Sequence, residues 1–191
     1  MTASGAAPSA ISSTGSGTDV GPGLVRSGPA AVAGVGGVEQ LQPGDIILYN
    51  EPYGTGSHPQ DAAVVMPVFF EGELIGYTAI KGHWLDIGGN VPGNYNPKAT
   101  ESFQEGVRIP PVKLIRAGVI QQDIVDILAA NSRVPQSNWG DLNGQINALD
   151  LGERRLHALL DEYGDETITA ALAELSSRAE AAAATAVAVS V

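Results

Sequence analysis

Two histidines and two aspartates stand in the same short pattern at two places in the chain. Asp61 follows His58 by three residues, and Asp86 follows His83 by three residues. Imidazole and carboxylate groups suit Zn, Mn and Fe(II), and two histidines with one carboxylate leave coordination positions open for water or substrate. We therefore take His58, Asp61 and His83 as candidate ligands of a divalent metal.

The segment between the two patterns predicts how these side chains meet. Residues 62–70 (AAVVMPVFF) are continuously apolar, which is typical of a buried strand. A turn at Glu71-Gly72-Glu73 and a return strand over residues 74–82 (LIGYTAIKG) complete a hairpin. A hairpin carries its two ends to one place, so we expect His83 to lie beside the loop that contains His58.

The residues around His58 favour a turn. A spacing of three would place His58 and Asp61 on opposite faces of a strand, whereas in a turn both can point the same way, and Pro59 and the preceding glycines favour a turn. The alternative is that both histidines make ordinary hydrogen bonds and bind no metal. Asp86 also has two interpretations: it orients a ligand histidine, or it caps backbone amides before Gly88-Gly89.

A long loop rich in Gly, Pro and Asn follows, over residues 86–111. Long ordered loops in compact domains are more often functional than not. Within it, Glu105 and Arg108 either line the site or form a structural ion pair, and we favour the ion pair. The third histidine, His157, lies among leucines in a predicted helix, and we expect it to be structural.

Composition excludes several classes of function. The 191 residues include no cysteine, which excludes disulfides, thiolate metal sites and a cysteine nucleophile. The absence of cysteine is also compatible with the cytoplasmic location that we expect. The net charge is −11 and the ten basic residues do not cluster, so nucleic acid is not an expected partner. No stretch approaches the roughly 20 apolar residues of a membrane span. No G-x-x-x-x-G-K-[ST] loop is present, so any ATP would be bound by another chain.

The order of the predicted elements indicates an α+β fold, with a strand and hairpin region and long loops followed by a helical region. Besides the hairpin, strands are expected at residues 45–50 and within 108–115, and Pro67 indicates an edge or a bulge in its strand. Residues 1–39 are low in complexity, and we expect them to be disordered.

Three helices are expected in the second half of the chain. The first has its apolar residues on one face between residues 120 and 128. The second begins near Asn138, with Gly152 as a candidate break. Gly164 is a stop signal, after which the third helix runs from about Glu166 to Ala182.

Four collinear runs of residues resemble the hydantoinase B/oxoprolinase family, which includes the B subunits of N-methylhydantoinases. The runs are PGDIILYNEPYGTGSHPQD (43–61), GHWLDIGGNVPG (82–93), ATESFQEGVRIPPVKL (99–114) and WGDLNGQINALDLGERRLHALLDEYG (139–164). The resemblance covers roughly residues 40–175.

The resemblance implies a function. Members are ATP-dependent amidohydrolases of cyclic amides such as 5-oxoproline, hydantoins and lactams, and related complexes carboxylate ketones. An A-type subunit binds ATP and phosphorylates the substrate, while the B-type part carries the metal site. In metal-bearing relatives the H-x-x-D motif and the later histidine are ligands, and they fall here on His58, Asp61 and His83.

The family's B part is longer at both ends than the region of resemblance. We therefore expect three segments: a low-complexity stretch over residues 1–39, a partial hydantoinase B/oxoprolinase-like domain over 40–178, and a low-complexity tail over 179–191. This division predicts a chain truncated at both ends. An inactive fragment is accordingly a third hypothesis, beside cyclic-amide hydrolysis and ketone carboxylation.

Overall fold

The computed structural model describes residues 27–52 and 58–189, and within them strands precede the long helices. The fold is α+β, as the order of elements predicts. The elements in chain order are α1 (Ser27–Gly34), η1 (Val38–Gln40), β1 (Ile46–Tyr49), β2 (Asp61–Phe70), β3 (Glu73–His83), η2 (Ser102–Glu105), β4 (Val112–Arg116), β5 (Val119–Ile120), α2 (Gln122–Ala130), α3 (Pro135–Tyr163) and α4 (Asp165–Val189).

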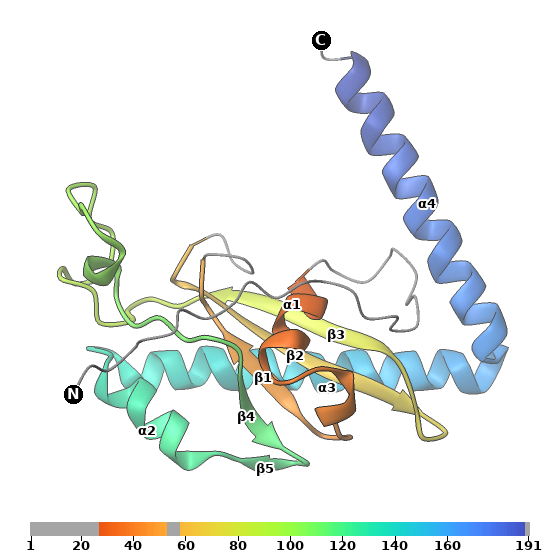
Figure 1. The fold of residues 1–191 in the computed structure, drawn as a ribbon, viewed down its shortest axis with the longest axis horizontal. Helices are drawn as coiled ribbons and strands as arrows, with labels where there is room; N and C mark the ends of the chain where they lie inside the picture. Colours follow the sequence, from red (N-terminus) through yellow and green to blue (C-terminus); the bar gives the residue numbers. More distant parts are fainter. Residues whose placement is uncertain (1–26, 53–57, 190–191) are drawn as a thin grey trace, which may run out of the picture.

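The strands form one antiparallel sheet in the order β3-β2-β1-β4-β5 (Figure 1). The β2–β3 hairpin turns at Glu71 and Gly72, which have φ values of 51° and 90°. Positive φ at both central residues is typical of the tight turn whose twist matches that of the flanking strands. The predicted hairpin is therefore confirmed.

The bulge that Pro67 predicts is also present. The register between β2 and β3 shifts between Val68 and Phe69. Although β2 is an interior strand, its pairing with β1 extends no further than Val65, so Pro67 lies beyond the end of β1. A proline can sit there without removing a hydrogen bond from that ladder.

The two faces of the sheet carry separate cores, because successive side chains of a strand point to opposite faces. On one face, Ala62, Val64 and Met66 pack with Leu142 and Leu149 of α3. The other face packs against α1, and its buried residues are Ala31, Val32, Leu41, Ile47, Tyr49, Ala63 and Val65. Figure 1 shows α1 and α3 on opposite sides of the sheet.

Two details of the predicted elements are wrong. Helix α1 and most of η1 fall within residues 1–39, which were expected to be disordered. Helix α1 is ordered because Ala31 and Val32 are buried against the sheet. Residues 1–26 lie outside the described residues. Helix α3 runs without a break through Gly152. A Cβ at Gly152 would lie 3.0 Å from Thr78 Cγ2, so this glycine allows α3 to approach β3 closely.

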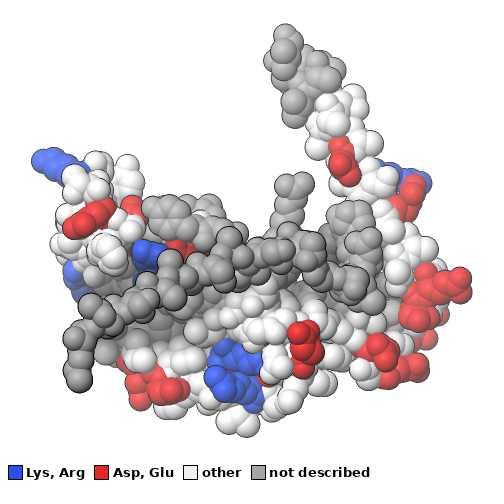
Figure 2. Space-filling model, in the orientation of Figure 1, with Lys and Arg blue, Asp and Glu red and all other residues white. Residues whose placement is uncertain are grey.

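Helix α3 ends as predicted at Gly164, which has a φ of 80°. Helix α4 then leads away from the sheet and continues into the expected tail (Figure 1). Acidic side chains gather near the junction of α3 and α4 in Figure 2, where the chain contains the exposed residues Asp161, Glu162, Asp165 and Glu166. Among the described residues, no helix is long and apolar enough to cross a membrane.

Candidate metal centre

The three candidate ligands lie at the end of the hairpin opposite its turn. The amide of Asp61 donates a hydrogen bond of 2.9 Å to the carbonyl of His58, which closes the predicted turn. His83 is the last residue of β3 and is directly paired with Asp61, the first residue of β2. Directly paired residues of antiparallel strands project to the same face. The turn and the register together bring the three side chains to one place.

Their ligand atoms form one compact group. One nitrogen from each histidine and one oxygen of Asp61 all lie within 4.8 Å of one another. His83 Nδ1 lies 2.9 Å from Asp61 Oδ1, and the rings of His58 and His83 stack with centroids 5.3 Å apart. The side chain of His83 is 60% exposed and that of Asp61 is 31% exposed. The group is therefore accessible to solvent.

This donor set fits a divalent metal. Nitrogen and oxygen ligands lie about 2 Å from zinc, so ligand atoms that share one ion are about 3–4 Å apart. The observed spread of at most 4.8 Å is close to this separation. Two imidazoles and one carboxylate also suit Mn and Fe(II), and three protein ligands leave positions free.

Asp86 does not join this group. Its buried carboxylate accepts hydrogen bonds from the amides of Gly88 (2.9 Å) and Gly93 (3.1 Å) and from Arg133 Nη1 (2.8 Å). Burial acts to raise the pKa of Asp86, but these amides and the guanidinium outweigh it, so the pKa is lowered. These contacts match the alternative in which Asp86 caps backbone amides and organises the loop.

Arg108 forms an ion pair, but its partner is not Glu105. Its Nε and Nη2 donate to Glu51 Oε2 at 3.0 and 2.7 Å. The backbone carbonyl of Glu105 accepts a hydrogen bond of 2.7 Å from Asn94 Nδ2. Glu51, Arg108 and the exposed ring of Phe103 line a cavity of about 480 Å³. The ion pair links Glu51, which follows β1, to the end of the long loop.

Sequence reasoning missed three buried amides next to the candidate ligands. Asn50 donates from Nδ2 to the carbonyl of Pro59 at 2.7 Å, and Gln60 donates from Nε2 to the carbonyl of Gly93 at 2.9 Å. Gln145 of α3 contacts both Ala62 and Trp84. A signal for Gln145 existed, because it lies seven residues after Asn138 on the buried face of α3, where an apolar residue is expected.

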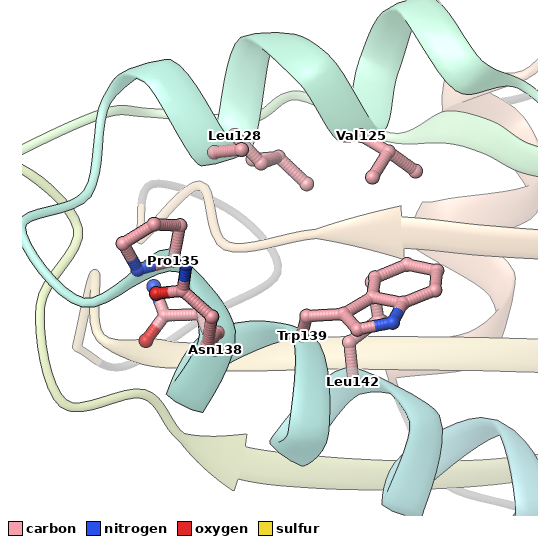
Figure 3. A pocket seen from close by; sticks show the side chains of 8 residues that line it. Val125, Leu128, Pro135, Asn138, Trp139 and Leu142 are labelled. Atoms are coloured by element: carbon pink, nitrogen blue, oxygen red, sulfur yellow. The ribbon is translucent and has the colours of Figure 1, made fainter.

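A separate apolar cavity of about 210 Å³ lies between α2 and α3. In Figure 3, Val125 and Leu128 of α2 face Trp139 and Leu142 of α3 across it. None of the described residues that line it has an ionisable side chain, and the amides of Gln136 and Asn138 supply polar groups. The candidate chemistry therefore lies at the end of the hairpin and not in this cavity.

The fold and the three-ligand group agree with a match to a known family. A model of the hydantoinase B/oxoprolinase family matches residues 18–190. Because this match covers most of the chain, the chain belongs to the hydantoinase B/oxoprolinase family.

Individual relatives give the same result. The chain is 45% identical over 149 residues to the caprolactamase subunit beta of Pseudomonas jessenii, with 78% of this chain and 26% of the relative covered. It is 31% identical over 172 residues to the 5-oxoprolinase of Dictyostelium discoideum, with 84% and 14% covered. The chain thus spans about a quarter or less of the length of these relatives.

Two solved structures share the fold. The ATP-dependent caprolactamase from Pseudomonas jessenii matches with a TM-score of 0.68 and 45% identity, over 72% of this chain and 24% of that one. A nucleotide-free acetone carboxylase matches with a TM-score of 0.66 and 23% identity, over 71% of this chain and 18% of that one. The second match concerns the fold alone.

Proposed function

We propose that this chain is the metal-bearing, B-type part of an ATP-dependent amidohydrolase that opens cyclic amides such as 5-oxoproline, hydantoins or lactams. The observation that carries the proposal is the convergence of His58, Asp61 and His83 at one solvent-accessible place. The names of its relatives, a caprolactamase subunit and a 5-oxoprolinase, support a cyclic amide as substrate.

The side chains of the group have complementary roles. Asp61 Oδ1 and His83 Nδ1 lie 2.9 Å apart, close to the separation of two atoms that ligate one ion. With Nδ1 unprotonated, both atoms would offer lone pairs to a shared metal. His58, which lies across the turn from Asp61, supplies the second imidazole. A divalent metal held there would polarise the oxygen under attack and activate water near neutral pH.

ATP would act elsewhere in the assembly. The chain lacks the phosphate-binding motif G-x-x-x-x-G-K-[ST], and its charge of −11 is unfavourable for a polyphosphate. We propose an A-type partner subunit that binds ATP and phosphorylates the amide oxygen, which turns a poor electrophile into a good one. The exposed group on this chain would then face the activated substrate.

Metal binding by histidine variants tests this proposal. The purified chain, alone and with its A-type partner, is dialysed against Zn²⁺ or Mn²⁺, and bound metal is measured by elemental analysis. His58→Ala is expected to lower the affinity about tenfold or more, because one of three protein ligands is lost. His157→Gln is the matched control, since His157 bonds to the Phe69 carbonyl instead. Full metal occupancy in His58→Ala would rule out the site.

Ketone carboxylation is the alternative reaction for the same site. Its support is the fold shared with acetone carboxylase, which does not distinguish the two reactions. Product analysis of the complex with ATP on a panel of lactams and hydantoins, and on ketones with bicarbonate, separates them. Turnover of ketones alone would replace the hydrolase proposal.

A further inference from the structure

The residues that follow the candidate ligands along the chain are held by side-chain amides. Pro59, which follows His58, accepts a hydrogen bond from Asn50. Ala62, which follows Asp61, and Trp84, which follows His83, share one partner on α3. Gln145 donates from Nε2 to the Ala62 carbonyl at 2.8 Å, and its Oε1 accepts from Trp84 Nε1 at 2.9 Å.

Gln145 acts from behind the sheet. The side chains of Ala62 and Trp84 belong to the core on the α3 face, and alternation along each strand places those of Asp61 and His83 on the opposite face. Gln145 is only 5% exposed, so its two hydrogen bonds form away from water. One buried amide thus links Ala62 of β2 to Trp84, the residue that follows β3, next to both ligand residues.

The sheet leaves space for this amide. Gly82, which precedes His83, is paired with Ala62 across the hairpin. A Cβ built at Gly82 would lie 2.9 Å from Gln145 Cδ and 3.0 Å from its Nε2. A side chain at position 82 would therefore displace the amide from the position in which it reaches both partners.

Packing alone does not favour a glutamine at this buried position. Its neighbours on the buried face of α3 include Leu142 and Leu149, and a buried amide is unfavourable unless its polar atoms are hydrogen-bonded. Here the acceptor and one donor of the amide are bonded, and both bonds go to residues adjacent to candidate ligands. Directional hydrogen bonds fix the spacing of two strands more narrowly than apolar contacts do.

We propose that Gln145 is a positioning residue of the metal centre, which sets the separation and orientation of Asp61 and His83 through the residues that follow them. The proposal rests on the proposed metal-binding function. It assigns to α3 a role beyond covering the sheet, since the helical half of the chain determines the geometry of a site built from strands and a turn.

Cobalt binding tests this role, because the visible spectrum of Co²⁺ reports the number and geometry of its ligands. The complete chain is titrated with Co²⁺ as wild type, Gln145→Met and Leu160→Ala, at a temperature where circular dichroism shows each to be folded. Leu160 is buried on the same helix but near the hairpin turn, one helical turn after His157, which contacts Phe69. It controls for loss of stability without loss of the amide.

Gln145→Met is expected to weaken Co²⁺ binding by about tenfold or more and to change the spectrum, as is typical when a residue that orients metal ligands is lost. Leu160→Ala is expected to retain the wild-type spectrum and affinity. If Gln145→Met does not fold, Gly82→Ala displaces the same amide and should give the same spectral change.

The outcomes separate the two proposals. Wild-type affinity and spectrum in Gln145→Met, or in Gly82→Ala if only that variant folds, would overturn the positioning role and leave the metal site intact. An equal change in Leu160→Ala would show that the effect comes from lost stability, and would also overturn the positioning role. Failure of the wild-type chain to bind Co²⁺, Zn²⁺ or Mn²⁺ would overturn the metal site and the positioning role together.

Discussion

The two ends of the β2–β3 hairpin are built differently. At the turn end, Glu71 and Gly72 reverse the chain through their own backbone conformations. At the site end, where Asp61 pairs with His83, the chain is fixed by buried polar side chains, most of which form hydrogen bonds to residues distant in sequence. These side chains are Asn50, Gln60, Asp86, Asn94 and Gln145. Local residues thus determine the reversal of the chain at the turn, whereas long-range hydrogen bonds determine the site end; Gln145 and Ala62 are 83 residues apart.

Asn50→Leu should break the site end most severely. Asn50 donates from Nδ2 to the carbonyls of Pro59 and Val107, and its Oδ1 accepts from the amide of Ile109. Leucine has a similar size but leaves the Pro59 and Val107 carbonyls and the Ile109 amide without this partner. Since each unpaired group costs about 1–3 kcal/mol, the free energy of unfolding should fall by about 4 kcal/mol.

Urea unfolding measures this loss, and Asn147→Leu on the exposed face of α3 is the matched control. The control should change stability by less than about 0.5 kcal/mol, as is usual at the surface. A loss below about 1 kcal/mol for Asn50→Leu would contradict the view that side-chain amides hold the site end.

Asp86→Asn should produce the next largest effect and lower the free energy of unfolding by about 3 kcal/mol near neutral pH. The reason is that a neutral amide cannot replace the carboxylate that Arg133 and two backbone amides bind. The pKa of Asp86 is lowered in the folded state. Its stabilisation is therefore complete above the unfolded pKa of about 4 and is lost as the pH falls through the lower folded value.

The stability difference between wild type and Asp86→Asn should accordingly shrink below about pH 4. Urea unfolding at several pH values from about 3 to 7 measures it. Asp141→Asn, at an exposed position on α3, corrects for general charge effects. A difference that stays constant over this range would contradict the assigned ionisation of Asp86.

Alanine substitutions at two glycines with positive φ allow the turn end of the hairpin and the loop at its site end to be compared directly. Gly72 in the turn has a φ of 90° and open space around it, whereas a Cβ at Gly88 would lie 2.3 Å from the carbonyl oxygen of Asn131. Alanine at a positive φ costs about 1–2 kcal/mol at either position. Gly88→Ala should cost about 1–2 kcal/mol more than Gly72→Ala because backbone must move. Equal thermal shifts in the two variants would show that the loop around Gly88 adapts.

The same contrast explains what the sequence could predict. The hairpin, its turn, the α+β order and the convergence of His58, Asp61 and His83 follow from local patterns, namely apolar runs, turn residues and the spacing of three. The partner of Asp86 could not be predicted, because Arg133 lies 47 residues away in sequence. The continuity of α3 through Gly152 could not be predicted for a similar reason, since the glycine packs closely against Thr78 of β3, which is distant in sequence.

His157→Gln should have the smallest effect, because it changes the turn end alone. His157 Nε2 contacts the Phe69 carbonyl at 2.9 Å, and its ring meets Phe70 edge-on with centroids 6.0 Å apart. Glutamine retains a donor for the carbonyl and loses the ring contact, which is worth about 0.5–1.5 kcal/mol. We therefore expect a loss of about 1 kcal/mol or less in thermal unfolding and an unchanged affinity for Zn²⁺. Weakened metal binding in this variant would mean that the two ends of the hairpin are coupled, because His157 lies at the opposite end from the candidate ligands.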